Sequence, residues 1–164
     1  MREDFGRGMR VLLVDDELMQ LKLMTRQILS AGFEVEAYDK LAKAIEIFDE
    51  HRFDLVITDM VLADGNGLSL AQHVHESGKD CEVVIITGFA SIESAIEAMR
   101  FRVADYFIKP MSAIQIQERL RRIVEHLRLK REHKRLVKEL SDTGKTIEVL
   151  QAQATRDPLT GLFN

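Results

Sequence analysis

The sequence contains a single cysteine, Cys81, among its 164 residues. One thiol excludes an internal disulfide and any zinc site built from several cysteines, and it gives no argument for secretion. No apolar run approaches the roughly 20 residues that a membrane-spanning helix needs. The polar start, Met1 to Asp4, lacks the apolar region of a signal peptide. We therefore expect a cytoplasmic protein without a membrane partner.

Apolar and charged residues are plentiful, at 46% and 30% of the chain. This composition can bury a core and is not that of a disordered chain. The length suits one ordinary domain with an appendage. Positive charge is concentrated in residues 119–138, which hold nine Lys or Arg against two Glu. A basic helix can bind nucleic acid, but a solvated helix face is the commoner explanation. A nucleic-acid partner is therefore not expected.

Short apolar runs divide the first two thirds of the chain. Val11–Val14, Leu55–Thr58 and Val83–Ile86 are typical of strands buried on both faces. Residues 33–38 alternate apolar and polar side chains, which predicts a half-exposed edge strand, and residues 104–108 predict a fifth strand. Helical periodicity fills the segments between them. Five strands alternating with helices predict an α/β fold, a doubly wound five-stranded parallel sheet of (βα)5 type.

Polar residues stand where four of these strands end. Asp15 and Asp16 follow the first strand, Asp59 the third, Thr87 the fourth and Lys109 the fifth. In such a sheet these ends share one edge, where ligands bind. Three neighbouring carboxylates repel one another unless a cation is present, and hard oxygen ligands favour Mg²⁺ over zinc. Singly, each residue has an ordinary explanation such as a helix cap or a solvated side chain; together they predict a binding site.

The chain carries one ordered series of motifs, namely Val14-Asp15-Asp16-Glu17, Asp59 after an apolar strand, Gly67, Thr87-Gly88 and Tyr106-x-x-Lys109-Pro110. Over residues 9–126 this series resembles a response-regulator receiver domain, a family with a flavodoxin-like fold. One position departs from the family pattern. Ala63 stands where the family usually has proline, so we expect the loop after Asp59 to be less rigid.

The resemblance implies a role for each residue at the sheet edge. Asp59 would be the phosphoacceptor, taking a phosphoryl group from a partner histidine kinase. Asp16 and Asp59 would bind Mg²⁺ directly, Asp15 through water, and Val61 through its backbone carbonyl. Lys109 would pair with the phosphoryl oxygens.

The resemblance also implies a switch. Thr87 would hydrogen-bond the phosphoryl group, and Tyr106 would reorient inward as Thr87 moves. That movement would couple the chemistry to the surface of a helix at 91–101. The peptide bond between Lys109 and Pro110 is a candidate for the cis form.

From Ser112 the sequence stays helical for about forty residues, longer than a domain of this size needs. Residues 127–154 are predicted to be a coiled-coil stalk that, with the receiver surface, forms a homodimer. An ordinary amphipathic helix packed on its own domain explains residues up to about 127 and not the rest. A register change between two apolar seams would give two packings. The first seam comprises Ile116, Leu120, Ile123 and Leu127, and the second Leu136, Leu140, Thr143, Ile147, Leu150 and Ala154.

The two ends of the chain lie outside the receiver region. Residues 1–8 are expected to be a flexible tail. Within residues 155–164 the run Asp157-x-Leu-Thr-Gly-Leu-x-Asn164 resembles the opening of a diguanylate cyclase (GGDEF) domain. We therefore expect a truncated output domain there and a natural protein that makes cyclic di-GMP, although this chain lacks the cyclase catalytic residues. Two alternatives stay open: the receiver of a transcriptional regulator with a DNA-binding or ATPase output, and a scaffold whose pocket is a relic.

Overall fold

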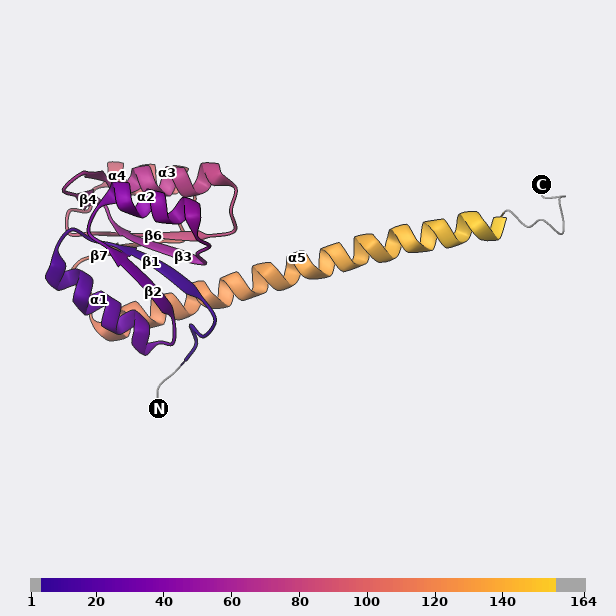
Figure 1. The fold of residues 1–164 in the computed structure, drawn as a ribbon, viewed down its shortest axis with the longest axis horizontal. Coiled ribbons are helices and arrows are strands. Elements are labelled where there is room, and N and C mark those ends of the chain that lie inside the picture. The colour runs from indigo at the N-terminus through magenta and orange to yellow at the C-terminus, as the bar shows by residue number, and fades with distance from the viewer. Residues whose placement is uncertain (1–3, 156–164) are drawn as a thin grey trace. The chain divides into compact units, whose positions relative to one another are not determined.

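The computed structural model describes residues 4–155, and there the predicted five-stranded parallel sheet is confirmed (Figure 1). The strands pair in the order β2-β1-β3-β6-β7, and every pair is parallel. The order reverses direction between β1 and β3, which makes the sheet doubly wound and opens a crevice there. The strands are β1 (Arg10–Val14), β2 (Glu34–Tyr38), β3 (Leu55–Asp59), β6 (Glu82–Thr87) and β7 (Asp105–Ile108).

Helices cover both faces of the sheet. In Figure 1, α2, α3 and α4 lie on one face, while α1 and the beginning of α5 lie on the other. This arrangement follows from right-handed crossovers between parallel strands. The helices are α1 (Leu18–Ser30), α2 (Leu41–Glu50), α3 (Gly67–Ser77), α4 (Ile92–Arg100) and α5 (Ala113–Thr155).

The core forms where these layers meet. The central strand β3 is buried at every residue except its last, Asp59, so the chain turns polar at the edge of the sheet. Phe48 of α2 and Leu70 of α3 are fully buried on one face, and Ile28 of α1 is fully buried in the other helix layer. Each such side chain contributes about 1.5–3 kcal/mol relative to an exposed one. The packed layers therefore hold the strand ends in place.

The expected flexible tail at residues 1–8 is wrong for residues 4–8. The ring of Phe5 packs edge-on against that of Phe33, with ring centroids 5.7 Å apart. The backbone N–H of Gly6 donates to the carbonyl of Ala31 at 2.8 Å. A buried aromatic partner, which the local sequence does not reveal, orders this segment.

The first apolar seam does not belong to a coiled coil, and the alternative of an amphipathic helix packed on its own domain is confirmed for residues 116–123. Contacts divide the chain into two compact units between Val124 and Glu125. Ile116, Leu120 and Ile123 lie in the first unit and are buried in its core. Apolar residues spaced three and four apart serve a helix on a sheet as well as a coiled coil. The register change between two exposed seams therefore loses its basis.

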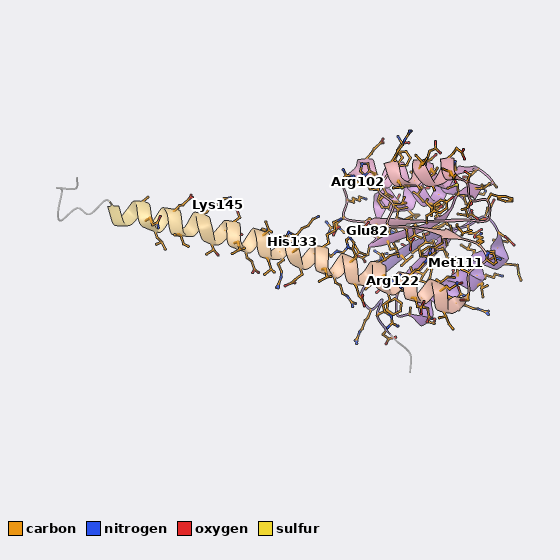
Figure 2. All side chains as sticks on the ribbon, turned by 180° about the vertical axis from the view of Figure 1, so that it is seen from behind. Glu82, Arg102, Met111, Arg122, His133 and Lys145 are labelled. Carbon is orange, nitrogen blue, oxygen red and sulfur yellow. The ribbon has the colours of Figure 1, made fainter. Side chains whose placement is uncertain are left out.

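The second unit, taken by itself, is helical from residue 125 to the end of α5. Its apolar side chains Leu136, Leu140, Ile147 and Leu150 are all exposed, as are the labelled His133 and Lys145 (Figure 2). Pairing of these side chains with another helix stays a prediction. Within residues 4–155 no helix has the length and apolar character needed to cross a membrane.

A small hairpin follows the central strand. β4 (Val61–Leu62) and β5 (Gly65–Asn66) pair antiparallel, and the turn between them carries Asp64. The Asp64 carboxylate accepts the backbone N–H groups of Leu41 and Ala42, at 2.8 and 3.0 Å, and so caps the start of α2. The loop was expected to be less rigid because Ala63 replaces proline. Its hairpin bonds and the cap supply restraint that does not depend on proline.

The capping bonds predict an acid-dependent contribution to stability. They hold the pKa of Asp64 below its usual value of 3.8. A group with a lowered folded-state pKa stabilises the protein fully above its unfolded pKa and loses that effect as pH falls through the folded pKa. Asp64→Ala should therefore lower the melting temperature at pH 7, and the difference from the parent should shrink below about pH 4.

Thermal unfolding followed by circular dichroism at both pH values measures this difference. Asp39→Asn is the matched control, since Asp39 is exposed near the same helix end while Leu41 and Ala42 donate to Asp64. A melting difference for Asp64→Ala that stays constant from pH 7 to pH 3 would contradict the charged cap.

Candidate functional site

Asp59 ends the central strand, and Gly67 fixes its backbone. The N–H of Gly67 donates to the carbonyl of Met60 at 2.7 Å, which brings the start of α3 against the end of β3. A Cβ atom at position 67 would collide with the carbonyl oxygen of Asp59. Only glycine permits this close approach. The motif glycine therefore places the Asp59 side chain at the sheet edge.

Three carboxylates meet at this edge, as the sequence predicted. Asp15, Asp16 and Asp59 each offer an oxygen, and these oxygens lie within 4.8 Å of one another. Asp15 is only 3% exposed, and its Oδ1 accepts the backbone N–H of Glu17 at 2.9 Å. Burial raises the pKa of Asp15, while the Glu17 amide and the Lys109 charge act against that rise. The cluster is thus an unfavourable concentration of negative charge.

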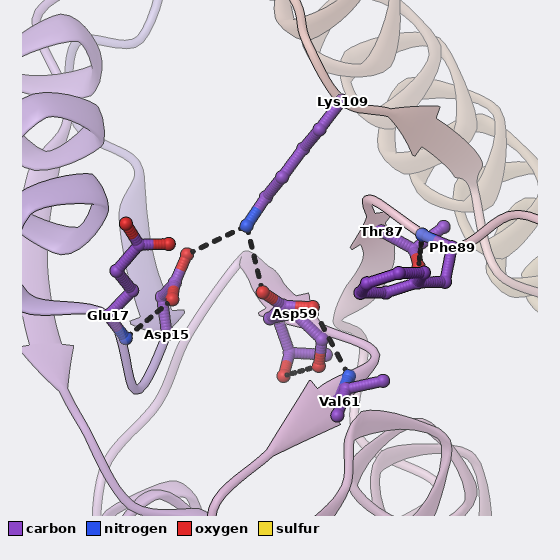
Figure 3. Close-up of polar contacts among 8 residues, drawn as sticks. Asp15, Glu17, Asp59, Val61, Thr87, Phe89 and Lys109 are labelled. Atoms are coloured by element: carbon purple, nitrogen blue, oxygen red, sulfur yellow. Dashed lines mark hydrogen bonds and ion pairs between the residues drawn. The ribbon is translucent and has the colours of Figure 1, made fainter.

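Lys109 brings the compensating positive charge across the edge. Its Nζ lies 2.8 Å from Asp59 Oδ2 and 3.3 Å from Asp15 Oδ2 (Figure 3). Burial alone would lower the pKa of this ammonium, but the hydrogen bond to Asp59 and the two carboxylate charges outweigh burial and raise it. Lys109 therefore stays protonated at neutral pH. The other oxygen of Asp59, Oδ1, accepts the backbone N–H of Val61 at 3.2 Å.

The donor set fits a divalent cation with a preference for oxygen. Three carboxylates face one ammonium, so the group keeps an excess negative charge that Mg²⁺ would neutralise. Val61 is anchored by its N–H to Asp59, which keeps its backbone close to the cluster. The predicted use of its carbonyl as a ligand stays a prediction.

Thr87 and Tyr106 lie in different surroundings from each other. Thr87 ends β6, the neighbour of β3, where Asp59 pairs with Ile86. The Thr87 side chain is 1% exposed and accepts the backbone N–H of Phe89 at 3.0 Å, which leaves its own proton free to donate (Figure 3). Tyr106 does not join the cluster. Its hydroxyl lies 2.7 Å from Ser94 Oγ in α4.

The peptide bond between Lys109 and Pro110 is cis, as predicted. Ser91 caps α4, and the Ser94 side chain of this cap also contacts Tyr106, which the sequence analysis missed. The usual capping box has Glu or Gln three residues after the cap, so a serine there gives no signal.

The comparisons with known proteins agree with this geometry. Residues 11–121 match the family model described as response regulator receiver domain. The photosynthetic apparatus regulatory protein RegA of Cereibacter sphaeroides is 30% identical over 71% of this chain and 64% of its own length. The transcriptional regulatory protein ZraR of Escherichia coli is 28% identical over 71% of this chain and 26% of its own. The chain thus spans less than two thirds of these relatives.

Solved structures share the fold. A CheY-like receiver domain protein from Methanospirillum hungatei superposes with a TM-score of 0.72 at 22% identity, covering 74% of this chain and 98% of that one. The non-phosphorylated receiver domain of HemR from Leptospira biflexa superposes with a TM-score of 0.67 at 26% identity, covering 71% of this chain and 94% of that one. On the family match and this shared fold, the chain belongs to the response regulator receiver domains.

Proposed function

We propose that Asp59 is the phosphoacceptor of a two-component response regulator and takes its phosphoryl group from a histidine kinase. The observation that carries this proposal is the Asp59 carboxylate at the end of the central strand, 2.8 Å from the Lys109 ammonium and clustered with Asp15 and Asp16. Such a carboxylate is a nucleophile with its charge stabilisation already in place. The membership in the receiver family supports the same role.

The transfer needs one bond to form and one to break. An Asp59 oxygen attacks phosphorus, the phosphorus–nitrogen bond of a phosphohistidine breaks, and the histidine nitrogen keeps the electron pair. Lys109 holds the negative charge of the phosphoryl oxygens. Mg²⁺ would be held by Asp15, Asp16, Asp59 and the Val61 carbonyl. It would supply positive charge beside the phosphoryl oxygens.

The first test is direct phosphorylation with a small donor. The full chain incubated with acetyl phosphate and Mg²⁺ should gain one phosphoryl group on Asp59, mapped by mass spectrometry. Asp59→Asn and chelation of the metal should each abolish the adduct, because they remove the nucleophile and the charge that stabilises transfer. Lys109→Ala should bind Mg²⁺ nearly as well but be phosphorylated at least about tenfold more slowly.

A control variant sharpens that test. His73→Ala removes a polar side chain that pairs with Asp49 on the surface, so its phosphorylation should match the parent. A modification that persists in Asp59→Asn, or one indifferent to chelation, would refute the assignment.

Thr87 and Tyr106 are proposed to couple phosphorylation of Asp59 to the surface formed by α4 and β7. The free proton of Thr87 would donate to a phosphoryl oxygen on the neighbouring strand. Tyr106 would then move inward, and the surface formed by α4 and β7 would repack. This surface already exposes Ile92, Met99 and Ile108, which supports its proposed role in pairing two receivers.

The exposed apolar face of the second unit is proposed to form a parallel coiled-coil stalk. Leu136, Leu140, Ile147 and Leu150 lie at spacings of three, four and seven residues and are exposed in the single chain. A second copy of the same helix would bury them. The homodimer would therefore use this face together with the receiver surface.

The stalk proposal predicts association that depends on the second unit. Light scattering should show dimers for the 164-residue chain and fewer or none for a chain ending near residue 127. Leu140→Glu should weaken association by at least about tenfold, since a buried charge in the seam is costly. Glu139→Lys is the control on the adjacent exposed position. If both the 164-residue chain and the shorter chain are monomers at high concentration, the stalk proposal is contradicted.

The output controlled by this receiver has two candidates. The resemblance of residues 157–164 to the start of a diguanylate cyclase domain favours a cyclase, although these residues lie outside the described part of the chain. RegA and ZraR carry regulatory names, and the basic residues 119–138 fit a transcriptional regulator. However, ZraR is matched over only 26% of its length, so its similarity supports the receiver rather than the output. The cyclase is therefore the preferred output. The proposed location of the protein is the cytoplasm.

A cyclase output predicts product formation that responds to Asp59. Two cyclase domains must bring two GTP molecules together, so a stalk that controls pairing would control the rate. The natural full-length protein should convert GTP to cyclic di-GMP, and beryllofluoride, a phosphoryl mimic, should change that rate. Asp59→Asn should keep the basal rate and lose the response. Absence of product in both states would exclude the cyclase, and product without a response would exclude the switch.

A further inference from the structure

The hydroxyl of Ser94 is shared between the cap of α4 and Tyr106. Ser91 Oγ accepts the Ser94 backbone N–H at 3.0 Å, and Ser94 Oγ accepts the Ser91 backbone N–H at 3.1 Å, so the two serines cap the helix reciprocally. The Tyr106 hydroxyl, which comes from β7, lies 2.7 Å from the same Ser94 Oγ. A residue of the proposed switch thus contacts the first turn of α4.

Ser94 Oγ has more neighbours than a hydroxyl can bond. Besides the Ser91 N–H and Tyr106, it lies 3.0 Å from the Ser91 carbonyl and 3.0 Å from Ser91 Oγ. A hydroxyl donates one hydrogen bond and accepts two. If Ser94 donates to the carbonyl and accepts the N–H, one lone pair remains. The Tyr106 and Ser91 hydroxyls compete for it, and the Tyr106 contact is the shorter.

We infer that Ser94 is a positioning residue that holds Tyr106 against the first turn of α4 while Asp59 is unphosphorylated. When Tyr106 leaves, the Ser91 hydroxyl can donate to the vacated lone pair, so the cap of α4 stays intact. Release of Tyr106 then breaks one hydrogen bond without unwinding the helix. This inference rests on the proposed phosphorylation of Asp59 and adds the group that Tyr106 must leave in order to move.

The size of the effect follows from a single hydrogen bond. A net bond of this kind is worth about two- to tenfold in an equilibrium between two side-chain positions. Removing the Ser94 hydroxyl should shift the Tyr106 population inward by that factor. Because a ligand binds better when its competent state is more populated, beryllofluoride should saturate at a correspondingly lower concentration.

The experiment uses Tyr106 as its own probe. The chain has two tyrosines and no tryptophan, so Tyr38→Phe leaves Tyr106 as the only tyrosine. With ¹³C-labelled tyrosine, the Tyr106 ring resonance of the full chain reports its position with and without Mg²⁺ and beryllofluoride. Ser94→Ala should move the resonance, without beryllofluoride, toward the position that the parent reaches when saturated.

Ser91→Ala is the matched control. Both variants lose one arm of the same cap, but only Ser94→Ala removes the oxygen next to Tyr106. Because Ser91→Ala removes a hydroxyl that competes with Tyr106, the inference predicts a ligand-free resonance at the parent position or farther from the saturated one. A resonance unmoved in Ser94→Ala, or moved equally in Ser91→Ala, would overturn it.

The beryllofluoride arm separates this inference from the proposed function. The midpoint of the beryllofluoride titration should fall about two- to tenfold in Ser94→Ala. In Ser91→Ala it should not fall, because loss of the competing Ser91 hydroxyl makes the release of Tyr106 harder. A parent that does not respond to beryllofluoride would refute the proposed phosphoacceptor. The ligand-free comparison of the two serine variants would then still decide whether Ser94 holds Tyr106.

Discussion

The contact of the Lys109 ammonium with the carboxylates of Asp59 and Asp15 is the interaction on which the site depends. It joins the ends of three strands, β7, β3 and β1, that lie far apart in the sequence. Without it, three carboxylates at a partly buried edge would repel one another. With it, the edge still carries excess negative charge. This excess negative charge suits the site to bind a divalent cation together with a phosphoryl group.

The backbone around Asp59 is held by contacts on several sides. Gly67 lets the start of α3 approach the Asp59 carbonyl, and the Val61 N–H holds one carboxylate oxygen. The hairpin after β3 is tied to α2 through Asp64. In its proposed role as phosphoacceptor, Asp59 would need little rearrangement before it reacts, and such preorganisation would lower the barrier to transfer. The same restraints limit how the backbone of the site can move, so the proposed signal would leave through side chains.

Thr87 and Tyr106 are the proposed route for this signal from the sheet edge to the surface. Thr87 is buried with its proton free, and Tyr106 is bonded to Ser94 at the start of α4. The signal would therefore exchange one hydrogen-bond partner for another rather than bend a strand. The exposed apolar residues on α4 and β7 lie where such a change would be read by a second protein surface.

The sequence alone determined the alternation of strands and helices and the residues at each strand end. Hydrophobic period and chain order are local properties, and parallel strands bring their ends to one edge, so Asp15, Asp16, Asp59 and Lys109 could be predicted together. Only the tertiary structure decided which contacts those elements make. It packed Phe5 on Phe33, buried Ile116 and Leu120 in the receiver, and paired Tyr106 with Ser94. These outcomes depend on the shape of a distant surface, since one apolar spacing suits a sheet or a second helix equally and a serine hydroxyl bonds whichever partner comes near.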